Sequence, residues 1–222
     1  RHALVREAAY AMLTDEDRGV GHRLAGAWLE GAGEGAASVL AEHFEKGELR
    51  ERAAVWYRRA AEHAFEGNDL ALALSWAERG IGCAEAGSAE VGWVGEMSLL
   101  QARAHLWRGQ NREGMRCGLT AMEKLPAGSA AWYEAIAEVA VASARIGDLV
   151  QLGACSELLL ARDPAAEGGE SRRDDLSAAQ ATSLARTARL GFFTGQSVTG
   201  ERLLHRSRSV ARRCPGNPKV IA

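Results

Sequence analysis

Few residues in this sequence interrupt helices. Only four of the 222 residues are proline, and none of the four lies inside a segment with apolar periodicity. β-branched residues are sparse and never alternate over a strand-length window, which argues against a β-sheet fold. No apolar run approaches the roughly 18 to 20 residues that a membrane span needs. Because 47% of the residues are hydrophobic and 25% are charged, general disorder is excluded, and we expect a folded protein of one or two domains.

Cysteine is also scarce and dispersed. Cys83, Cys117, Cys155 and Cys214 form no CxxC pair, which argues against a zinc knuckle or a dithiol redox motif. Dispersed single thiols fit a reducing compartment, so we expect a cytoplasmic protein with small buried thiols in its helices. The sequence begins at Arg1 without methionine or a signal-peptide pattern, and we expect it to be a piece of a longer protein.

The common motifs of catalytic and cofactor sites are missing. None of the three lysines lies in a phosphate-binding loop, and the glycines of residues 31–35 have the wrong spacing for a dinucleotide site. HExxH and GxSxG do not occur. Pairs of Glu and His recur 20 residues apart, at Glu42-His43 and Glu62-His63, but hydrogen bonds between helices explain them better than a metal ion does. We therefore expect no enzymatic activity, no cofactor and no metal.

Helix-forming residues dominate what is present. Ala, Leu, Glu and Arg are abundant, and apolar stripes predict helices over residues 4–13, 20–28 and 39–44. Glycines that end predicted helices then recur at steps of 20, 20, 22, 19 and 19 residues, with a further one near the end of the chain. These glycines are Gly47, Gly67, Gly87, Gly109, Gly128, Gly147 and Gly195. Each step holds one helix and a short turn, so successive helices are antiparallel, and the repeated pair predicts an α-solenoid.

Two of these helix pairs match each other closely. Gly109 and Gly147 are 38 residues apart, and so are Pro126 and Pro164. Glycine permits the left-handed conformation that ends a helix, and proline stops the second helix of the pair. A turn glycine and a terminal proline that keep the same separation indicate two copies of one structural unit.

These units resemble tetratricopeptide (TPR) repeats, which place small residues where paired helices approach closely. The matching positions are Ala102, Gly109, Gly114, Ala121 and Pro126 in one unit, Ala140, Gly147 and Pro164 in the next, and Gly47, Ala53, Tyr57 and Ala60 in an earlier one. Leu152 and Leu159 stand where small residues are usual. The resemblance covers residues 36–164 and continues to 213. It implies an all-α, TPR-like, right-handed superhelix of about five antiparallel helix pairs.

A second resemblance lies at the start of the sequence. The segments His2–Tyr10, Gly21–Ala25 and Leu40–Phe44 look like a junction found in large bacterial signalling ATPases of the STAND type, some of which are fused to Ser/Thr kinases. The resemblance implies a helical junction over residues 1–35 after an ATPase-type domain, a repeat array over 36–213 and a truncated tail over 214–222. It also implies a scaffold or sensor segment that binds a partner protein or peptide, or other domains of the same parent chain.

The TPR resemblance also implies which side chains line the concave groove. They are Glu96, Arg103 and Trp107 from one unit and Glu134, Val141 and Arg145 from the next. Arg and Trp are favoured anchors at interfaces, although ordinary solvated surface explains these positions equally well. We expect most of the six tryptophans to lie in the core, between alanine-rich faces.

Charge is unevenly distributed along the chain. Residues 172–222 carry a net charge of +7, whereas the whole chain carries −2. The arginine-rich helix predicted over 202–213 could bind nucleic acid through phosphates, but it lacks interleaved aromatics. We favour a last repeat helix whose exposed apolar edge invites self-association. A small effector bound inside the superhelix is a further alternative to a protein partner.

Overall fold

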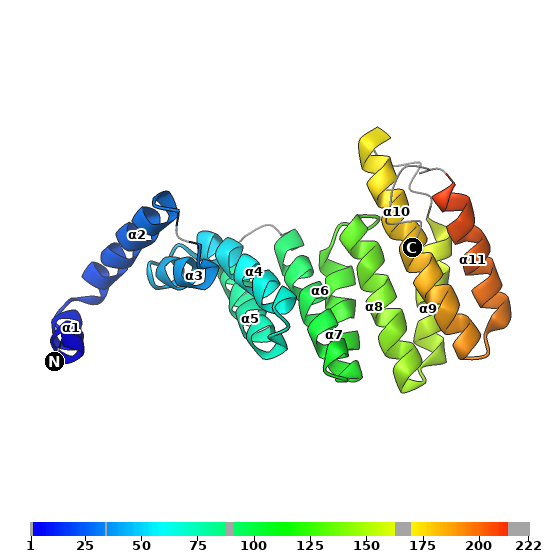
Figure 1. Cartoon of the computed structure of the whole chain (residues 1–222), viewed down its shortest axis with the longest axis horizontal. Helices are drawn as coiled ribbons and strands as arrows, with labels where there is room; N and C mark the ends of the chain where they lie inside the picture. Colours follow the sequence, from blue (N-terminus) through cyan, green and yellow to red (C-terminus); the bar gives the residue numbers. More distant parts are fainter. Residues whose placement is uncertain (1, 34, 88–90, 163–169, 213–222) are drawn as a thin grey trace. The chain divides into compact units, whose positions relative to one another are not determined.

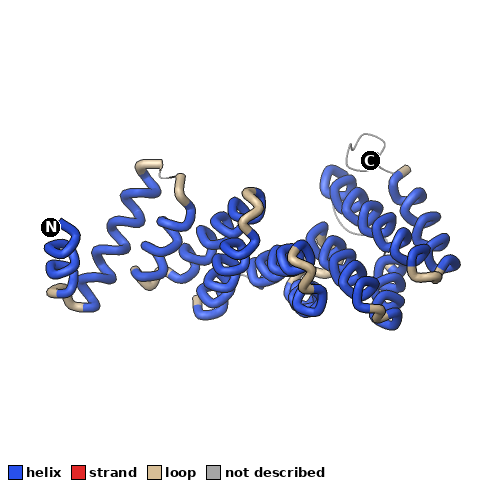
Figure 2. The backbone as a smooth tube through the Cα atoms, turned by 60° about the horizontal axis from the view of Figure 1, so that its bottom comes forward, coloured by secondary structure: helices blue, strands red, loops and turns tan. Residues whose placement is uncertain are grey.

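The computed structural model describes residues 2–33, 35–87, 91–162 and 170–212 (Figure 1). Within these residues, 85% of the chain is helical and no strand occurs (Figure 2). The helices are α1 His2–Ala11, α2 Asp15–Gly31, α3 Ala37–Lys46, α4 Arg50–Glu66, α5 Leu70–Ala86, α6 Val91–Trp107, α7 Asn111–Lys124, α8 Ala130–Ile146, α9 Leu149–Ala161, α10 Glu170–Phe193 and α11 Ser197–Ala211. The predicted all-α fold is therefore confirmed. Pro164, Cys214 and the predicted tail over 214–222 lie outside the described residues.

The chain forms two compact units, Arg1–Met97 and Ser98–Ala222. The first contains α1 to α5 and the beginning of α6, and the second contains the rest of α6 and α7 to α11. None of the helices in the described part of the chain is long and apolar enough to cross a membrane.

Five turns share one backbone geometry, which explains why residues that end helices recur at regular intervals in the sequence. Each turn has one residue with positive φ, and the N–H of the following residue donates to the carbonyl five positions earlier. This is the Schellman arrangement that satisfies the last carbonyls of a helix. The five donor–acceptor pairs are Leu49–Phe44, Asp69–Ala64, Gln110–His105, Asp148–Ser143 and Gln196–Gly191, at 2.7–2.9 Å.

Glycine takes the left-handed position in only some of these turns. Gly109 and Gly147 have φ of 73° and 78° as predicted. Glu48 and Asn68 take this position in the earlier turns, with φ of 61° and 60°. Gly47 instead has a negative φ, and a Cβ there would lie 2.8 Å from the side chain of Arg23 in α2. Gly47 therefore ends α3 as predicted, at a position that allows close helix packing, and Glu48 takes the left-handed conformation.

In the first compact unit, the helices are paired differently from the prediction. The repeat predicted around Gly47 joins α3 to α4, but α4 packs against both α3 and α5. Counting back from the α6–α7 and α8–α9 pairs places α4 with α5, joined by the turn at Asn68. Both turns have the same geometry, so glycine spacing could not distinguish the turn within a pair from the turn between pairs.

Glycine permits close helix contact inside the second unit. A Cβ at Gly114 of α7 would lie 2.8 Å from Leu106 of α6, and one at Gly118 would lie 2.6 Å from Val139 of α8. Normal carbon contacts are about 3.5–4.0 Å, so neither position accepts a side chain without movement. α7 therefore packs against α6 on one side and α8 on the other through positions that have no side chain.

The core is made mostly of alanine, leucine and a few aromatics, and the expected tryptophan core is wrong. Among the six tryptophans only Trp132 is buried, and Trp28 and Trp107 are 70% and 75% exposed. Tyr57 and Tyr133 are the largest fully buried side chains. Helices that approach through glycine and alanine leave too little space between them for an indole ring.

A polar cluster joins α3, α4 and α5 in the first unit. Tyr57 donates a 2.6 Å hydrogen bond to Glu45, Arg79 donates to Glu42 at 3.2 Å and also to Glu45, and the Cys83 thiol lies 3.7 Å from Glu45. Burial would raise the pKa of Glu45, but the hydrogen bonds from Tyr57 and Arg79 lower it. Burial, with the nearby Glu45 carboxylate, raises the pKa of Cys83 to about 11. The thiol is structural, as predicted for the cysteines within the helices.

Histidine links α2 to α3. His22 Nδ1 lies 3.0 Å from His43 Nδ1, and the Tyr10 hydroxyl lies 2.9 Å from His22 Nε2. The predicted inter-helix role of His43 is confirmed, whereas His63 is exposed. Burial, followed by the charges of His43 and Lys46, lowers the pKa of His22.

Candidate partner-binding site

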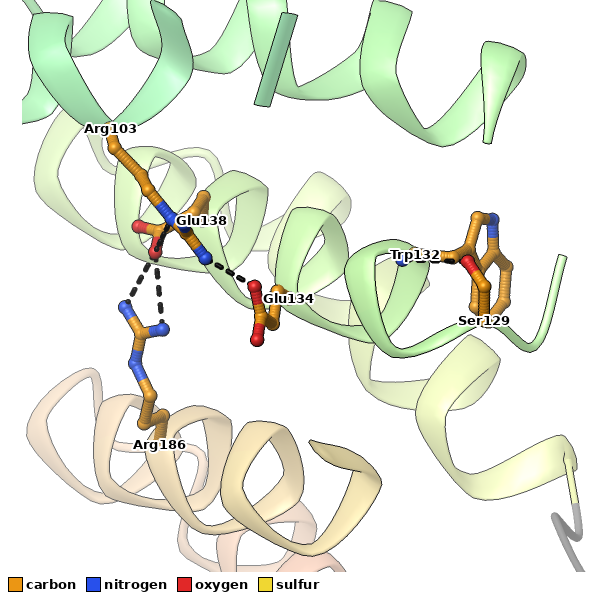
Figure 3. Close-up of polar contacts among 6 residues, drawn as sticks. All are labelled: Arg103, Ser129, Trp132, Glu134, Glu138 and Arg186. Carbon is orange, nitrogen blue, oxygen red and sulfur yellow. Dashed lines mark hydrogen bonds and ion pairs between the residues drawn. The ribbon is translucent and has the colours of Figure 1, made fainter. Parts of the chain in front are cut away.

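Arginine and glutamate side chains connect the first helices of successive pairs in the second unit (Figure 3). Arg103 of α6 donates to Glu134 of α8, and its Nε lies 3.7 Å from Oε1 of Glu138. Arg186 of α10 donates to the same Oε1 from both terminal nitrogens, at 3.2 and 3.1 Å. Glu138 therefore joins α6, α8 and α10 through a carboxylate that lies between two guanidinium groups.

Glu138 is the most buried charged group of this cluster. Its side chain is only 10% exposed, whereas the side chains of Arg103 and Arg186 are 34% and 38% exposed. A buried carboxylate requires charge-assisted hydrogen bonds, because burial without them costs several kcal/mol. The two arginines provide these contacts, so Glu138 fixes the positions of both guanidinium groups.

A cavity of about 560 Å³ lies between α6, α8 and α10. Two basic and two acidic groups line it: Arg103, Arg186, Glu134 and Asp175. The other lining residues are small or carry a hydroxyl, and they are Ala130, Ala178, Ala179, Thr182 and Ser183. The cavity thus combines charged groups with short side chains that leave space between the helices.

The lining residues of α10 share one face because of their spacing. Asp175, Ala178, Ala179, Thr182 and Ser183 recur at intervals of three or four residues, which place side chains on one side of a helix. The glutamates of α8, at 134 and 138, are also four residues apart. The local helical pattern therefore aligns polar groups from facing helices.

Polar groups of this cavity differ in how well they are satisfied. Thr182 donates its hydroxyl to the carbonyl of Ala178 at 2.9 Å. Ser183 also lines the cavity and is 2% exposed. Asp175 is exposed and, among the residues that the structure describes, has no ion-pair partner. Asp175 is therefore a lining carboxylate that no described side chain neutralises.

The structure brings together only some of the residues that the sequence predicted for the groove. Arg103 and Glu134 meet in the cavity. Arg145 is exposed and donates to the carbonyl of Leu106 at 3.0 Å. Trp107 ends α6 and is 75% exposed, outside the cavity lining. Val141 is half-buried and does not line the cavity either.

Glu96, the remaining predicted residue, belongs to the first unit. It accepts a 2.7 Å hydrogen bond from Arg58, which connects α6 to α4. A similar contact joins α4 to α2, where Arg52 and the indole N–H of Trp56 donate to Glu30. Arg–Glu contacts between the first helices of neighbouring pairs are thus a feature of both units.

Four polar residues at or beside the cavity escaped the sequence analysis: Asp175, Ser183 and Arg186, which line it, and Glu138, which contacts Arg186. Arg186 lies 48 residues from Glu138 in the sequence, so their contact depends on the packing of α10 against α8. The one available signal was the run of small and hydroxyl residues at helical spacing in α10, ending at Arg186. The side chains in that run are short, and they leave space between this face of α10 and a neighbouring helix.

The basic helix predicted over 202–213 is partly neutralised within the second unit. Arg202 of α11 donates to Glu157 of α9 at 3.0 Å, and Arg206 donates to the carbonyl of Arg162 at 3.2 Å. Arg208 and Arg212 are exposed. Of these arginines, Arg202 is paired with an acidic side chain.

The fold is also found in solved structures. No family model and no curated protein matches the sequence. Two crystal structures of a Podosopora anserina protein with nearly identical TPR-like repeats, described as a kinesin light chain, do match. One, a point variant, has a TM-score of 0.50 at 14% identity and covers 92% of this chain and 100% of that chain. The other has a TM-score of 0.49 at 15% identity, with 93% and 100% covered. The chain therefore has a TPR-like α-solenoid fold.

Proposed function

We propose that this chain is a protein-interaction segment that binds a peptide or a domain of a partner protein on the face formed by α6, α8 and α10. The observation that carries the proposal is the cavity of about 560 Å³, lined by Arg103, Glu134, Asp175 and Arg186, on a TPR-like array. Ligand cavities typically have volumes of about 300–1,000 Å³ with a few convergent polar groups. This cavity meets both conditions.

The chemistry of the lining supports binding rather than catalysis. Arg103, Glu134 and Arg186 are held in ion pairs between helices. The part of the chain that the structure describes contains no group of three or more His, Cys, Asp or Glu placed to hold a metal ion. Burial raises the pKa of Cys155 to about 11, so this thiol is not activated as a nucleophile. Repeat folds of this kind usually act as scaffolds.

The setting that we propose is a cytoplasmic bacterial signalling protein of the STAND type, in which this segment follows the nucleotide-driven switch. Support comes from the N-terminal junction residues and from α1 and α2, which form where the junction pattern predicts helices. Partner binding would then bias the equilibrium of the switch through different affinities for its two states. The partner is a separate protein or another domain of the same parent chain.

Photo-crosslinking tests the proposed binding face directly. A benzophenone amino acid replaces Thr182, which is exposed and lines the cavity, and in a control protein it replaces Val150 of α9, which is 86% exposed and lies outside the lining. Both proteins are irradiated in lysate of the source cells, with and without nuclease. We expect a defined set of proteins to be crosslinked from position 182 and not from position 150, with no effect of nuclease.

The same experiment separates the alternatives. Equal products from both positions would contradict a specific site on the α6, α8 and α10 face. Crosslinked products that disappear after nuclease treatment would favour the basic 202–213 helix as the binding element. Loss of crosslinking from position 182 after removal of small molecules would favour an effector in the cavity.

A further inference from the structure

We propose that His22 of α2 and His43 of α3 together bind a late transition-metal ion, Cu(II) or Ni(II), which connects the two helices. The site lies in the first unit, and the inference is independent of the function proposed for α6, α8 and α10. It is argued from the distance between two imidazole nitrogens, from the hydrogen bond that orients one ring and from the chemistry of the ligands.

The two imidazoles present nitrogens at a chelating distance. His22 Nδ1 lies 3.0 Å from His43 Nδ1, although the residues are 21 positions apart. Bonds from a metal ion to histidine nitrogen are about 2.0–2.1 Å long, so two nitrogens on one ion are ~2.9 Å apart at a right angle and ~3.4 Å apart at the tetrahedral angle. The observed separation matches the right angle of square-planar or octahedral coordination. An ion can therefore take the place of the hydrogen bond between the two nitrogens with little movement of the helices.

A contact on the opposite side of the ring holds His22 in this orientation. The Tyr10 hydroxyl of α1 lies 2.9 Å from His22 Nε2, and the two rings meet edge to face. Histidines that bind metal usually make such a contact through their other nitrogen, which fixes the orientation and the tautomer of the ring. When Nε2 donates to Tyr10, Nδ1 keeps its lone pair for the ion. His22 is thus already placed as a ligand.

The pair can be reached from solvent, and His22 is in its neutral form at pH 7. Both histidines are half-buried, so a hydrated ion has access to them. Burial, followed by the charges of His43 and Lys46, lowers the pKa of His22. Metal binding requires the neutral imidazole, so His22 has no proton to lose at neutral pH. Lys46 is exposed, and salt screens its repulsion of the ion.

The ligands select the class of metal. Imidazole suits copper, nickel and zinc, whereas calcium and magnesium require oxygen ligands. Glu42, beside His43, accepts a hydrogen bond from Arg79 at 3.2 Å. Because the described part of the chain contains no group of three or more His, Cys, Asp or Glu that could hold a metal ion, the protein supplies two ligands and water the others. The right-angle separation favours Cu(II) and Ni(II) over tetrahedral Zn(II). This proposal replaces the expectation of no metal, which was argued from the pair Glu42-His43.

Isothermal titration calorimetry with Ni(II) tests the proposal on the 222-residue chain. All proteins carry His2→Gln and Cys214→Ser, which remove competing ligands near the two ends of the chain. We expect the chain to bind one equivalent of Ni(II), to melt at a higher temperature when Ni(II) is added, and to give no binding heat with Mg(II).

Single substitutions assign the two ligands. His22→Gln and His43→Gln should each weaken Ni(II) binding by at least about tenfold and abolish the rise in melting temperature, because each removes one of two protein ligands. His63→Gln, which removes an exposed histidine of α4, is the matched control and should change neither quantity. Far-UV circular dichroism checks that each variant is folded.

Electron paramagnetic resonance of the Cu(II)-loaded chain identifies the ligands without relying on a ligand variant. The signal should show splitting from two imidazole nitrogens. Tyr10→Phe keeps both ligands and removes the hydrogen bond to His22 Nε2. It should therefore retain the signal of two nitrogens and weaken Ni(II) binding by less than the loss of His22 or His43 does.

The outcomes separate this site from metal binding elsewhere on the chain. Loss of the Ni(II) site in both His22→Gln and His43→Gln, with His63→Gln unaffected, supports the inference. Unchanged affinity in either ligand variant overturns it, because the ion is then bound elsewhere. Absence of saturable Ni(II) binding, or a Cu(II) signal without two imidazole nitrogens, overturns it as well. None of these results bears on partner binding by α6, α8 and α10.

Discussion

Gly118→Ala tests the close packing on which the position of α8, and with it the cavity, depends. The added Cβ would lie 2.6 Å from Cγ2 of Val139 and 3.8 Å from Cβ of Ala102. Val139 is fully buried, so it has little space to move away. Restoring a normal carbon contact needs a displacement of roughly 1 Å between α7 and α8.

The expected effect is the difference between two opposing contributions. Overpacking of a filled core costs about 1–3 kcal/mol. Replacing glycine by alanine inside a helix gains about 0.5–1 kcal/mol. We expect Gly118→Ala to lower the free energy of unfolding by about 1–2 kcal/mol, measured by urea denaturation with far-UV circular dichroism. The opposite sign is expected for Gly153→Ala in α9, where a Cβ meets nothing within 4 Å.

A double-mutant cycle identifies the contact that causes the loss. In a Val139→Ala background the obstructing methyl group is absent, so adding Gly118→Ala should cost about 1 kcal/mol less than it does in the unmodified chain. Stabilisation of the chain by Gly118→Ala to the same extent as by Gly153→Ala would refute the close approach of α7 and α8.

Three further predictions follow from titration and burial. Because the pKa of His22 is lowered in the folded chain, stability should be full above pH 6.5 and should fall as the pH drops through that lowered pKa; His22→Gln should flatten this part of the stability curve in thermal melts. Glu138→Ala should cost about 1–2 kcal/mol in urea denaturation and Glu134→Ala less than about 1, since Glu138 is the more buried carboxylate; equal costs would contradict the central place of Glu138. The thiols of Cys83 and Cys155, both with a pKa raised to about 11, should react with iodoacetamide at pH 8 roughly 100-fold more slowly than a free cysteine, as mass spectrometry of each site would show.

Turn chemistry made most of the fold predictable from the sequence. The spacing of Gly109 and Gly147 predicted two helix pairs because left-handed backbone strongly favours glycine, and both residues take that conformation. Glu48 and Asn68 show the limit of this rule. A long or polar side chain can occupy the left-handed position when the following N–H is satisfied. In the first of these turns the glycine one position earlier, Gly47, serves close packing against Arg23 instead.

The cavity was less predictable because it depends on contacts between helices far apart in the sequence. Arg103 and Glu134 follow from repeat positions, since equivalent faces of successive first helices meet. The contact of Arg186 with Glu138 requires the relative placement of α8 and α10, which no local pattern specifies. Trp107 is the last residue of α6 and is 75% exposed, which repeat spacing alone did not indicate.

The affinity of the partner identified by crosslinking, measured by isothermal titration calorimetry, tests the central claim most directly. The unmodified chain is compared with Thr182→Arg, which fills the cavity with a bulky cation, and with Val150→Arg, which adds the same side chain outside the cavity lining. We expect Thr182→Arg to weaken binding at least tenfold and Val150→Arg to leave it unchanged. Equal affinity of all three proteins would contradict partner binding on the face of α6, α8 and α10.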